Sequence, residues 1–149
     1  VMRSNDQHLD FDLDLAKIHS NENSVYYFQY AITRSAGLFR KLQEQQWSYH
    51  DSAAIANREL LTTDFESILL GELMRLPEVI ESAAQNRAPQ ILANYLRETA
   101  NAFHSVYENC DILSEDEPLR QARLGLCKVT SQVLSNGLAL LGVSAPERM

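Results

Sequence analysis

The stretch of the chain that decides its fold class is SEDEPLRQARLGLCKVTSQVLSNGLALLG, residues 114–142. Apolar residues recur in it at steps of three and four, which is the period of an amphipathic helix. We expect a single helix from about Glu115 to Leu141 that ends at Gly142. The apolar face of this helix should comprise Leu119, Ala122, Leu126, Val129, Val133 and Leu140.

Two local features refine that prediction. Ser114 and Glu117 have the spacing of a capping box, in which each side chain bonds a backbone N–H at the helix start. Gly125 and Gly137 lie inside the helix, where each costs roughly 1 kcal/mol relative to Ala. We therefore expect both glycines to permit close contacts with neighbouring helices.

The rest of the chain carries the same helical period. We expect helices over residues 24–46, 52–61 and 89–109, and another that begins at residue 63 and continues past residue 80. Ser24 caps the first, Thr63 and Glu66 form a capping box, and Pro77 interrupts the helix because it lacks a backbone donor. The predicted apolar faces include Val25, Phe28, Ile32, Ala36 and Phe39, and then Phe65, Ile68, Leu69, Leu73, Leu76 and Ile80. Helices joined by such short loops make an all-α, antiparallel helical bundle.

Residues 1–24 differ from the rest of the chain. Apolar and acidic residues alternate from Leu9 to Leu15, which is typical of a half-buried extended segment. The polar residues from Ser20 to Ser24 then end this pattern. We place a domain boundary there, between a segment of residues 1–24 and a bundle of residues 25–149.

Composition sets further bounds. The 149 residues suffice for one compact domain, and no apolar run approaches the roughly 18 residues of a transmembrane helix. Cys110 and Cys127 are not part of a CxxC motif, so we expect two free thiols in the core and a reducing compartment. The net charge of -7 counts against a nucleic-acid partner, although a domain can still bind a few unstacked RNA bases.

Catalytic and metal-binding motifs are absent from the sequence. Its four histidines are scattered, and no phosphate-binding glycine loop or nucleophile motif occurs. Asp10, Asp12 and Asp14 resemble the start of a calcium loop, but Leu15 and Asn21 stand where such a loop needs Gly and Glu. We therefore expect no catalytic residue and no metal site, which favours a binding or structural module.

Five segments, in the right order, resemble bacterial arginyl-tRNA synthetases. They are Met2–Asp6 with His8–Lys17; Val25–Ala31 with Arg34; Ala93–Leu96 with Phe103 and Tyr107–Cys110; Leu119–Leu124; and Asn136–Gly142 with Pro146–Met149. The fourth is similar to the core of the DALR anticodon-binding domain of that family, with Glu117–Arg120 in place of Asp-Ala-Leu-Arg. Ile32 stands where many relatives carry His.

This resemblance implies a function for the chain. Residues 1–24 would be the tail of the catalytic and stem-contact region, and residues 25–149 the anticodon-binding bundle at the C-terminal end of a class I synthetase. The whole enzyme would ligate arginine to its tRNA with ATP and Mg²⁺. This chain lacks the ATP motifs, so it should hold no cofactor and be inactive alone. Expected partners are the tRNA(Arg) anticodon loop and the catalytic domain, for a cytoplasmic, monomeric protein.

The resemblance also points to RNA-binding residues. The set is Gln29, Tyr30, Arg34, Asn94, Tyr107, Arg123, Arg148 and Met149. Tyr30 and Tyr107 would stack on bases, or else pack within the bundle. Either Arg34 or Arg123 could contact RNA or form an internal ion pair; Gln29 could be solvated, and Asn94 could cap a helix. The alternative function is a helical protein-interaction bundle with no RNA role.

Overall fold

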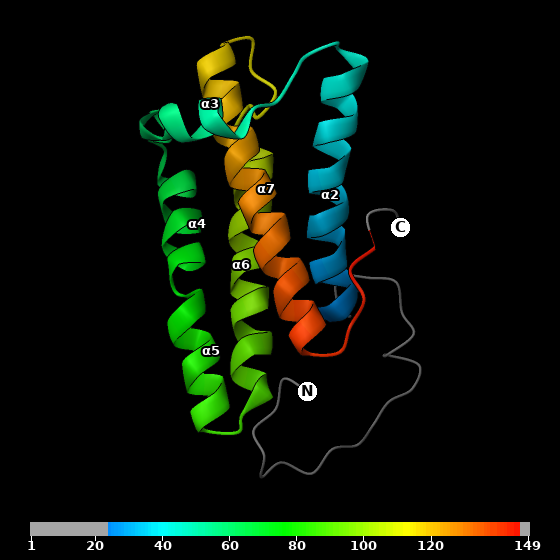
Figure 1. Ribbon diagram of the computed structural model, residues 1–149, viewed down its shortest axis with the longest axis vertical. Coiled ribbons are helices and arrows are strands. Elements are labelled where there is room, and N and C mark those ends of the chain that lie inside the picture. Colours follow the sequence, from blue (N-terminus) through cyan, green and yellow to red (C-terminus); the bar gives the residue numbers. More distant parts are fainter. Residues whose placement is uncertain (1–23, 147–149) are drawn as a thin grey trace.

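The computed structural model describes residues 24–146, which form a bundle of helices (Figure 1). The helices are α2 (Ser24–Glu44), α3 (Asp51–Ala56), α4 (Asp64–Met74), α5 (Leu76–Gln85), α6 (Pro89–Asn109) and α7 (Glu117–Leu140), with a 3₁₀ helix at Arg58–Leu60. No strand occurs within residues 24–146, and the predicted all-α fold is confirmed. The extended segment predicted at residues 9–15 lies outside the described residues.

Helix α6 occupies the middle of the bundle. Helices α4 and α5 pack along one side of it, and α2 and α7 pack against it on the other (Figure 1). Helices α4 and α5 run in one direction and α6 and α7 then alternate, so that α2 and α6 run parallel to each other and antiparallel to α4, α5 and α7. The short α3 crosses one end of the bundle and rests on α7. Segments far apart in the sequence, α2 and α6, are thereby brought side by side.

The start of α4 and the break after it agree with the sequence. The Thr63 hydroxyl accepts a hydrogen bond from the Glu66 backbone N–H at 3.2 Å, and the Glu66 carboxylate accepts one from the Thr63 N–H at 2.9 Å. This is the predicted capping box. Pro77 lies in the first turn of α5, and Arg75 separates α5 from α4. The predicted interruption at Pro77 is therefore confirmed.

The capping box predicted at Ser114 is wrong. Helix α7 begins at Glu117 with Asp116 as N-cap, and the Ser114 hydroxyl instead accepts from the Asp116 N–H at 3.3 Å. A helix capped by Ser114 would need residue 118 to donate its N–H to the Ser114 carbonyl. Residue 118 is Pro118, which has no N–H, so the helix starts later. Ser24 similarly lies within α2 rather than before it.

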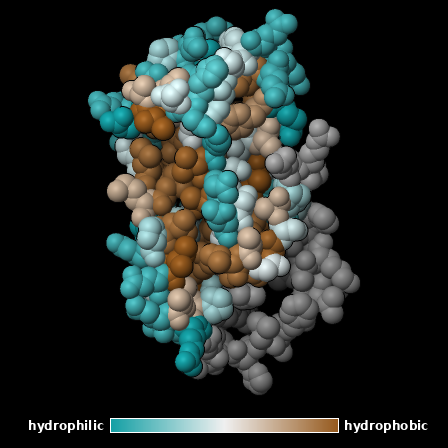
Figure 2. Space-filling model, in the orientation of Figure 1, coloured by the Kyte–Doolittle hydropathy of each residue, from teal (hydrophilic) through white to brown (hydrophobic). Residues whose placement is uncertain are grey.

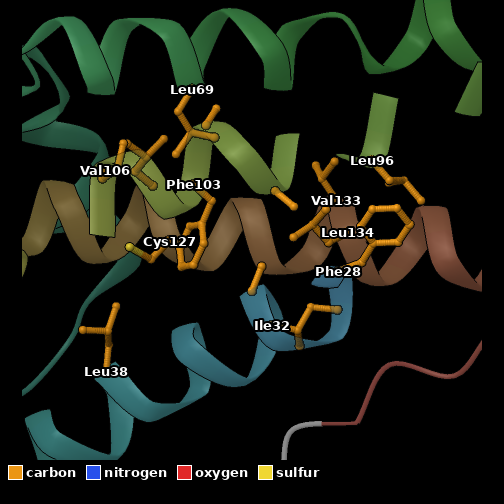
Figure 3. Packing of buried hydrophobic residues seen from close by; sticks show 14 of the residues in the cluster. Phe28, Ile32, Leu38, Leu69, Leu96, Phe103, Val106, Cys127, Val133 and Leu134 are labelled. Carbon is orange, nitrogen blue, oxygen red and sulfur yellow. The ribbon is translucent and has the colours of Figure 1, made fainter. Parts of the chain in front are cut away.

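The core lies between α6 and its neighbours (Figure 3). On α7 the fully buried apolar residues are Leu124, Cys127, Leu134 and Leu138. Several residues predicted for apolar faces are exposed instead: Val25, Phe65, Ile68, Ile80, Val129 and Leu140. A period of three and four identifies an apolar face, but it does not show whether another helix covers that face.

Both interior glycines of α7 mark close helix contacts, as predicted. A Cβ at Gly125 would lie 2.7 Å from the Ala54 Cβ on α3, and a Cβ at Gly137 would overlap the Leu96 side chain on α6. The helix ends at Leu140, and Gly142 adopts a left-handed φ of +74°. The Gly142 N–H bonds the Ala139 carbonyl at 3.0 Å, which completes a helix C-cap of the Schellman type.

Candidate nucleic-acid interface

The parallel helices α2 and α6 bring three of the predicted residues together. Tyr30 and Arg34 lie one turn apart on α2, and Tyr107 lies on α6. The guanidinium carbon of Arg34 is 4.6 Å from the centroid of the Tyr30 ring and 4.6 Å from that of the Tyr107 ring. A cation over an aromatic face is attracted by the ring quadrupole, so each ring helps to fix the Arg34 side chain.

Two residues of α6 complete the surroundings of Arg34. Its Nη1 lies 3.1 Å from His104 Nδ1 and 3.4 Å from Glu108 Oε1. Burial, with the nearby Arg34 charge, lowers the pKa of His104 to about 4. The imidazole is therefore neutral at pH 7, and its Nδ1 can accept a hydrogen bond from Arg34.

A hollow of about 340 Å³ opens beside this cluster. Its walls are Tyr27, Tyr30 and Arg34 from α2, with Asn101, His104, Ser105 and Glu108 from α6. Aromatic faces, an amide, a hydroxyl, a guanidinium and a carboxylate thus surround one space. Such groups suit an unstacked RNA base, which needs a surface to stack on and partners for its edges.

The aromatic residues at the start of α2 extend the surface. The Tyr26 and Tyr30 rings lie nearly parallel, 9° between planes, with centroids 6.4 Å apart. Tyr27 meets His104 edge to face at 4.7 Å, and burial raises the pKa of the Tyr27 hydroxyl. The run of tyrosines is half-buried, which leaves part of each ring accessible.

Gln29 holds the segment that follows α7 instead of facing the hollow. Its Nε2 donates to the Ser144 carbonyl at 2.8 Å, and the Thr33 hydroxyl donates to the Pro146 carbonyl at 3.5 Å. Residues 141–146 are thereby fixed along α2. Arg148 and Met149 lie outside the described residues, and their RNA contacts stay predictions.

Arg123 lies away from this surface, in the interior. Its Nε is 2.6 Å from Glu66 Oε1, and its Nη1 donates to the Asp111 carbonyl at 2.8 Å. The side chain is only 10% exposed and Glu66 is fully buried. Of the two alternatives for Arg123, the structure contains the internal ion pair.

The arginine of the DALR-like segment is structural as well. Arg120 is buried, donates to the Ser114 carbonyl at 2.6 Å, and lies 3.9 Å above the centroid of the Trp47 ring. It joins the loop before α7 to the loop after α2. Ile32, at the position where relatives carry His, is buried in the core, so it does not reach RNA.

Asn94 lies on α6, half-buried, seven residues before Asn101 and therefore about two turns away on the same face. Its side chain makes no hydrogen bond with residues 24–146, and it caps no helix there. The residues of the hollow that the sequence did not predict are Tyr27, Asn101, His104, Ser105 and Glu108. A polar stripe over Asn94, Asn101, Ser105 and Glu108 was the available signal, because these residues recur on one side of a helix.

Within residues 24–146 no helix is long and apolar enough to cross a membrane. The same range contains no group of three or more His, Cys, Asp or Glu side chains placed to hold a metal ion.

Comparison with known proteins agrees with the geometry. The DALR anticodon binding domain family matches residues 28–149. The chain is 52% identical, over its whole length, to arginine–tRNA ligases of Coxiella burnetii and Halorhodospira halophila, and it spans about 25% and 26% of their lengths. It superimposes on Thermus thermophilus arginyl-tRNA synthetase with a TM-score of 0.78 and 30% identity, covering 100% of this chain and 25% of that one. For an arginyl-tRNA synthetase described as putative, from Campylobacter jejuni, the TM-score is 0.73, at 26% identity over 99% of this chain and 31% of that one.

The helical bundle, its aromatic and polar surface and the family match together define the class, an anticodon-binding domain of an aminoacyl-tRNA synthetase. Within that class, the chain belongs to the arginyl-tRNA synthetase family. It spans about a quarter of the length of the curated relatives it matches.

Proposed function

We propose that this chain binds the anticodon loop of tRNA(Arg) with the surface formed by α2, α6 and the segment after α7. The observation that carries the proposal is the contact of Arg34 with Tyr30 and Tyr107 beside the polar hollow. Anticodon bases are unpaired, so they can stack on tyrosine rings and present their edges to polar side chains.

Each side chain has a distinct part in this proposal. Tyr30 and Tyr107 supply ring faces for stacking, and Arg34 supplies a planar cation for a base or a phosphate. Asn101 and Ser105 bond base edges, and the Glu108 carboxylate accepts from an exocyclic amino group. Asn94 extends this row along α6. Gln29 acts by holding the C-terminal segment, which would bring Arg148 and Met149 to the same loop.

We further propose that the longer protein is an arginine–tRNA ligase that uses ATP and Mg²⁺ in the cytoplasm. The names and lengths of the relatives support this, since this chain corresponds to about a quarter of them. The chain would then act with a catalytic domain, as a monomer, and would not aminoacylate alone. A protein-interaction bundle remains the competing function, but a hollow lined mainly by polar and aromatic groups favours RNA.

Binding of a labelled tRNA(Arg) anticodon stem-loop tests the proposal, with a loop-scrambled RNA as control. Loss of one stacked base contact costs about 1–3 kcal/mol, so Tyr30→Ala and Tyr107→Ala should each weaken cognate binding roughly fivefold to a hundredfold. Phe65→Ala is the matched control, because Phe65 is an exposed aromatic residue on α4, across the bundle from α2.

The cognate loop should bind better than the scrambled loop, and Phe65→Ala should leave that preference unchanged. Equal binding of the two loops, both by this chain and by the full-length protein, would contradict the proposal. A full-length protein that discriminates while this chain does not would mean that the anticodon surface needs phosphate contacts from the rest of the synthetase.

A further inference from the structure

A second groove lies between α2 and α7, on another side of α2 from the hollow between α2 and α6. Its volume is about 580 Å³, within the range of roughly 300–1,000 Å³ that is usual for sites of small ligands. The cations Arg40 and Lys128 line it, and no Asp or Glu side chain does. In a chain with a net charge of -7, such a groove suits an anionic ligand.

Arg40 is the cation available to that ligand. Its side chain is half-buried and makes no hydrogen bond or ion pair with residues 24–146. Lys128, in contrast, is held by the Asp51 carboxylate, whose two oxygens lie 2.8 and 2.9 Å from the Lys128 Nζ. An unpaired guanidinium favours a phosphate, because the two groups can form paired hydrogen bonds.

The walls of the groove offer hydroxyl groups and aromatic rings. Ser131 and Ser135 lie one turn apart on α7, both half-buried, and neither hydroxyl bonds another of the described residues. Phe39 and Tyr49 also line the groove, and their rings pack edge to face with centroids 5.4 Å apart. Free hydroxyls beside an aromatic surface suit the sugar and the base of a nucleotide.

The outer side of α2 connects this groove with the hollow. Arg34 lines the hollow, Arg40 lines the groove, and Gly37 lies between them at steps of three residues. Residues three apart adjoin on a helix surface, and two such steps advance about 9 Å and turn about 120° around the helix axis. Gly37 has no side chain to obstruct this path, and the Arg40 Nη2 lies 3.6 Å from where a Cβ of Gly37 would be. The Arg40 guanidinium therefore lies on the path itself.

We propose that the groove is a second nucleotide site of the RNA-binding surface. The RNA backbone crosses α2 at Gly37, one phosphate pairs with Arg40, and a further nucleotide lies against Ser131 and Ser135. This site rests on the proposed function, since it extends the path of the RNA beyond the hollow. The bound loop thereby contacts both flanks of α2.

Binding of the tRNA(Arg) anticodon stem-loop to the full-length protein at several salt concentrations tests the phosphate contact. Arg40→Gln should weaken binding about fivefold at 0.1 M salt and make the slope of log K against log salt shallower by about 0.7, because one phosphate contact is lost. Arg87→Gln is the matched control, because it removes the same charge from an exposed residue in a separate hollow between α5 and α6. An unchanged slope for Arg40→Gln, or an equal change for Arg87→Gln, would overturn the assignment of Arg40.

A negative charge placed inside the groove tests the location of the nucleotide. Ser135→Asp should weaken binding at least as much as Arg40→Gln, whereas Asn136→Asp adds the same charge one residue along α7, outside the groove, and should have little effect. If Tyr30→Ala weakens binding but Ser135→Asp and Arg40→Gln do not, this second site is overturned and the proposed function stands. Equal binding of the cognate and scrambled loops by the full-length protein would overturn both.

Discussion

Glu66 joins the first turn of α4 to α7 through its side chain. One carboxylate oxygen closes the capping box of α4, and the other accepts from Arg123, which is 57 residues away on α7. Burial alone would raise the pKa of Glu66, but the Thr63 hydrogen bonds and the Arg123 guanidinium outweigh it and lower that pKa. The carboxylate is therefore ionised in the folded protein, and its charge is compensated on both sides.

Removing one partner of the Glu66–Arg123 ion pair should lower the free energy of unfolding more than replacing both partners. Arg123→Met leaves a buried carboxylate without its cation, and we expect a loss of about 3–5 kcal/mol in the free energy of unfolding. The double variant Glu66→Gln, Arg123→Met should recover a large part of that loss, as measured by urea denaturation. Arg123→Met should not change RNA affinity under conditions where it is folded. If a folded Arg123→Met variant bound RNA more weakly, Arg123 would have to be part of the RNA-binding surface.

His104 should make stability depend on pH. Its folded pKa of about 4 lies below the ordinary value of 6.5, so the unfolded chain takes up a proton first as the pH falls. The contribution of neutral His104 to the free energy of unfolding is complete above pH 6.5. It declines between pH 6.5 and 4, by up to roughly 3 kcal/mol. His104→Asn keeps an acceptor near Arg34 and does not titrate. Its denaturation midpoint should change less than that of the wild type over this interval.

At the residue scale, the sequence predicted part of the site. Tyr30, Arg34 and Tyr107 were predicted and are in contact, whereas Arg123 is in the interior. His104 was missed because nothing in the period of α6 shows which of its faces meets α2. A contact between residues 70 apart, such as Arg34 with His104, depends on how whole helices pack.

At the scale of elements, three helices end in the same way. Helices α2, α5 and α7 are each followed by a residue with positive φ: Gln46 at 59°, Arg87 at 50° and Gly142 at 74°. In each case the next residue donates its N–H to a carbonyl of the last helical turn: Trp47 to Leu42, Ala88 to Ala83 and Val143 to Leu138. Only Gly142 was predictable from the sequence, because glycine is the usual residue at this position and the other two give no such signal.

The glycines of α4 and α7 should respond oppositely to an added methyl group. Gly137→Ala would overlap Leu96, and forced overpacking costs about 1–3 kcal/mol. Gly71→Ala meets nothing within 4 Å on α4, so it should stabilise the protein by about 1 kcal/mol through helix propensity. Thermal unfolding of both variants measures the difference. A neutral Gly137→Ala would mean that α6 and α7 are not packed as closely as described.

On the scale of the whole molecule, charge limits how RNA can be bound. The chain carries a net charge of -7, and the described cations along the outer side of α2 are Arg34, Arg40 and Lys41. Each contact to a single-stranded phosphate contributes about 0.7 to the salt slope, so log K against log salt should fall no more steeply than about -2. Titrations at several salt concentrations measure this slope, and a value near -4 would require cations elsewhere.

One side of the molecule is apolar and exposed, although the sequence predicted that apolar residues there, such as Val129, would be buried. Figure 2 shows apolar surface between α4 and α7, where a groove of about 560 Å³ is lined by Ile55, Leu70, Leu73, Leu126 and Val129. Helical periodicity identifies apolar faces but not what covers them. Val129, which is 52% exposed, therefore looked like a core residue in the sequence.

The reaction of the buried cysteines with alkylating reagents can measure how often the bundle opens. Burial, with the nearby Cys110 thiol, raises the pKa of Cys127 to about 12, and both thiols are free and enclosed. Alkylating reagents attack thiolates, so Cys127 does not react while the helices stay together. The rate at which Cys127 is alkylated therefore reports how often α6 and α7 separate, and ligands that bind the folded chain should slow it without any introduced probe.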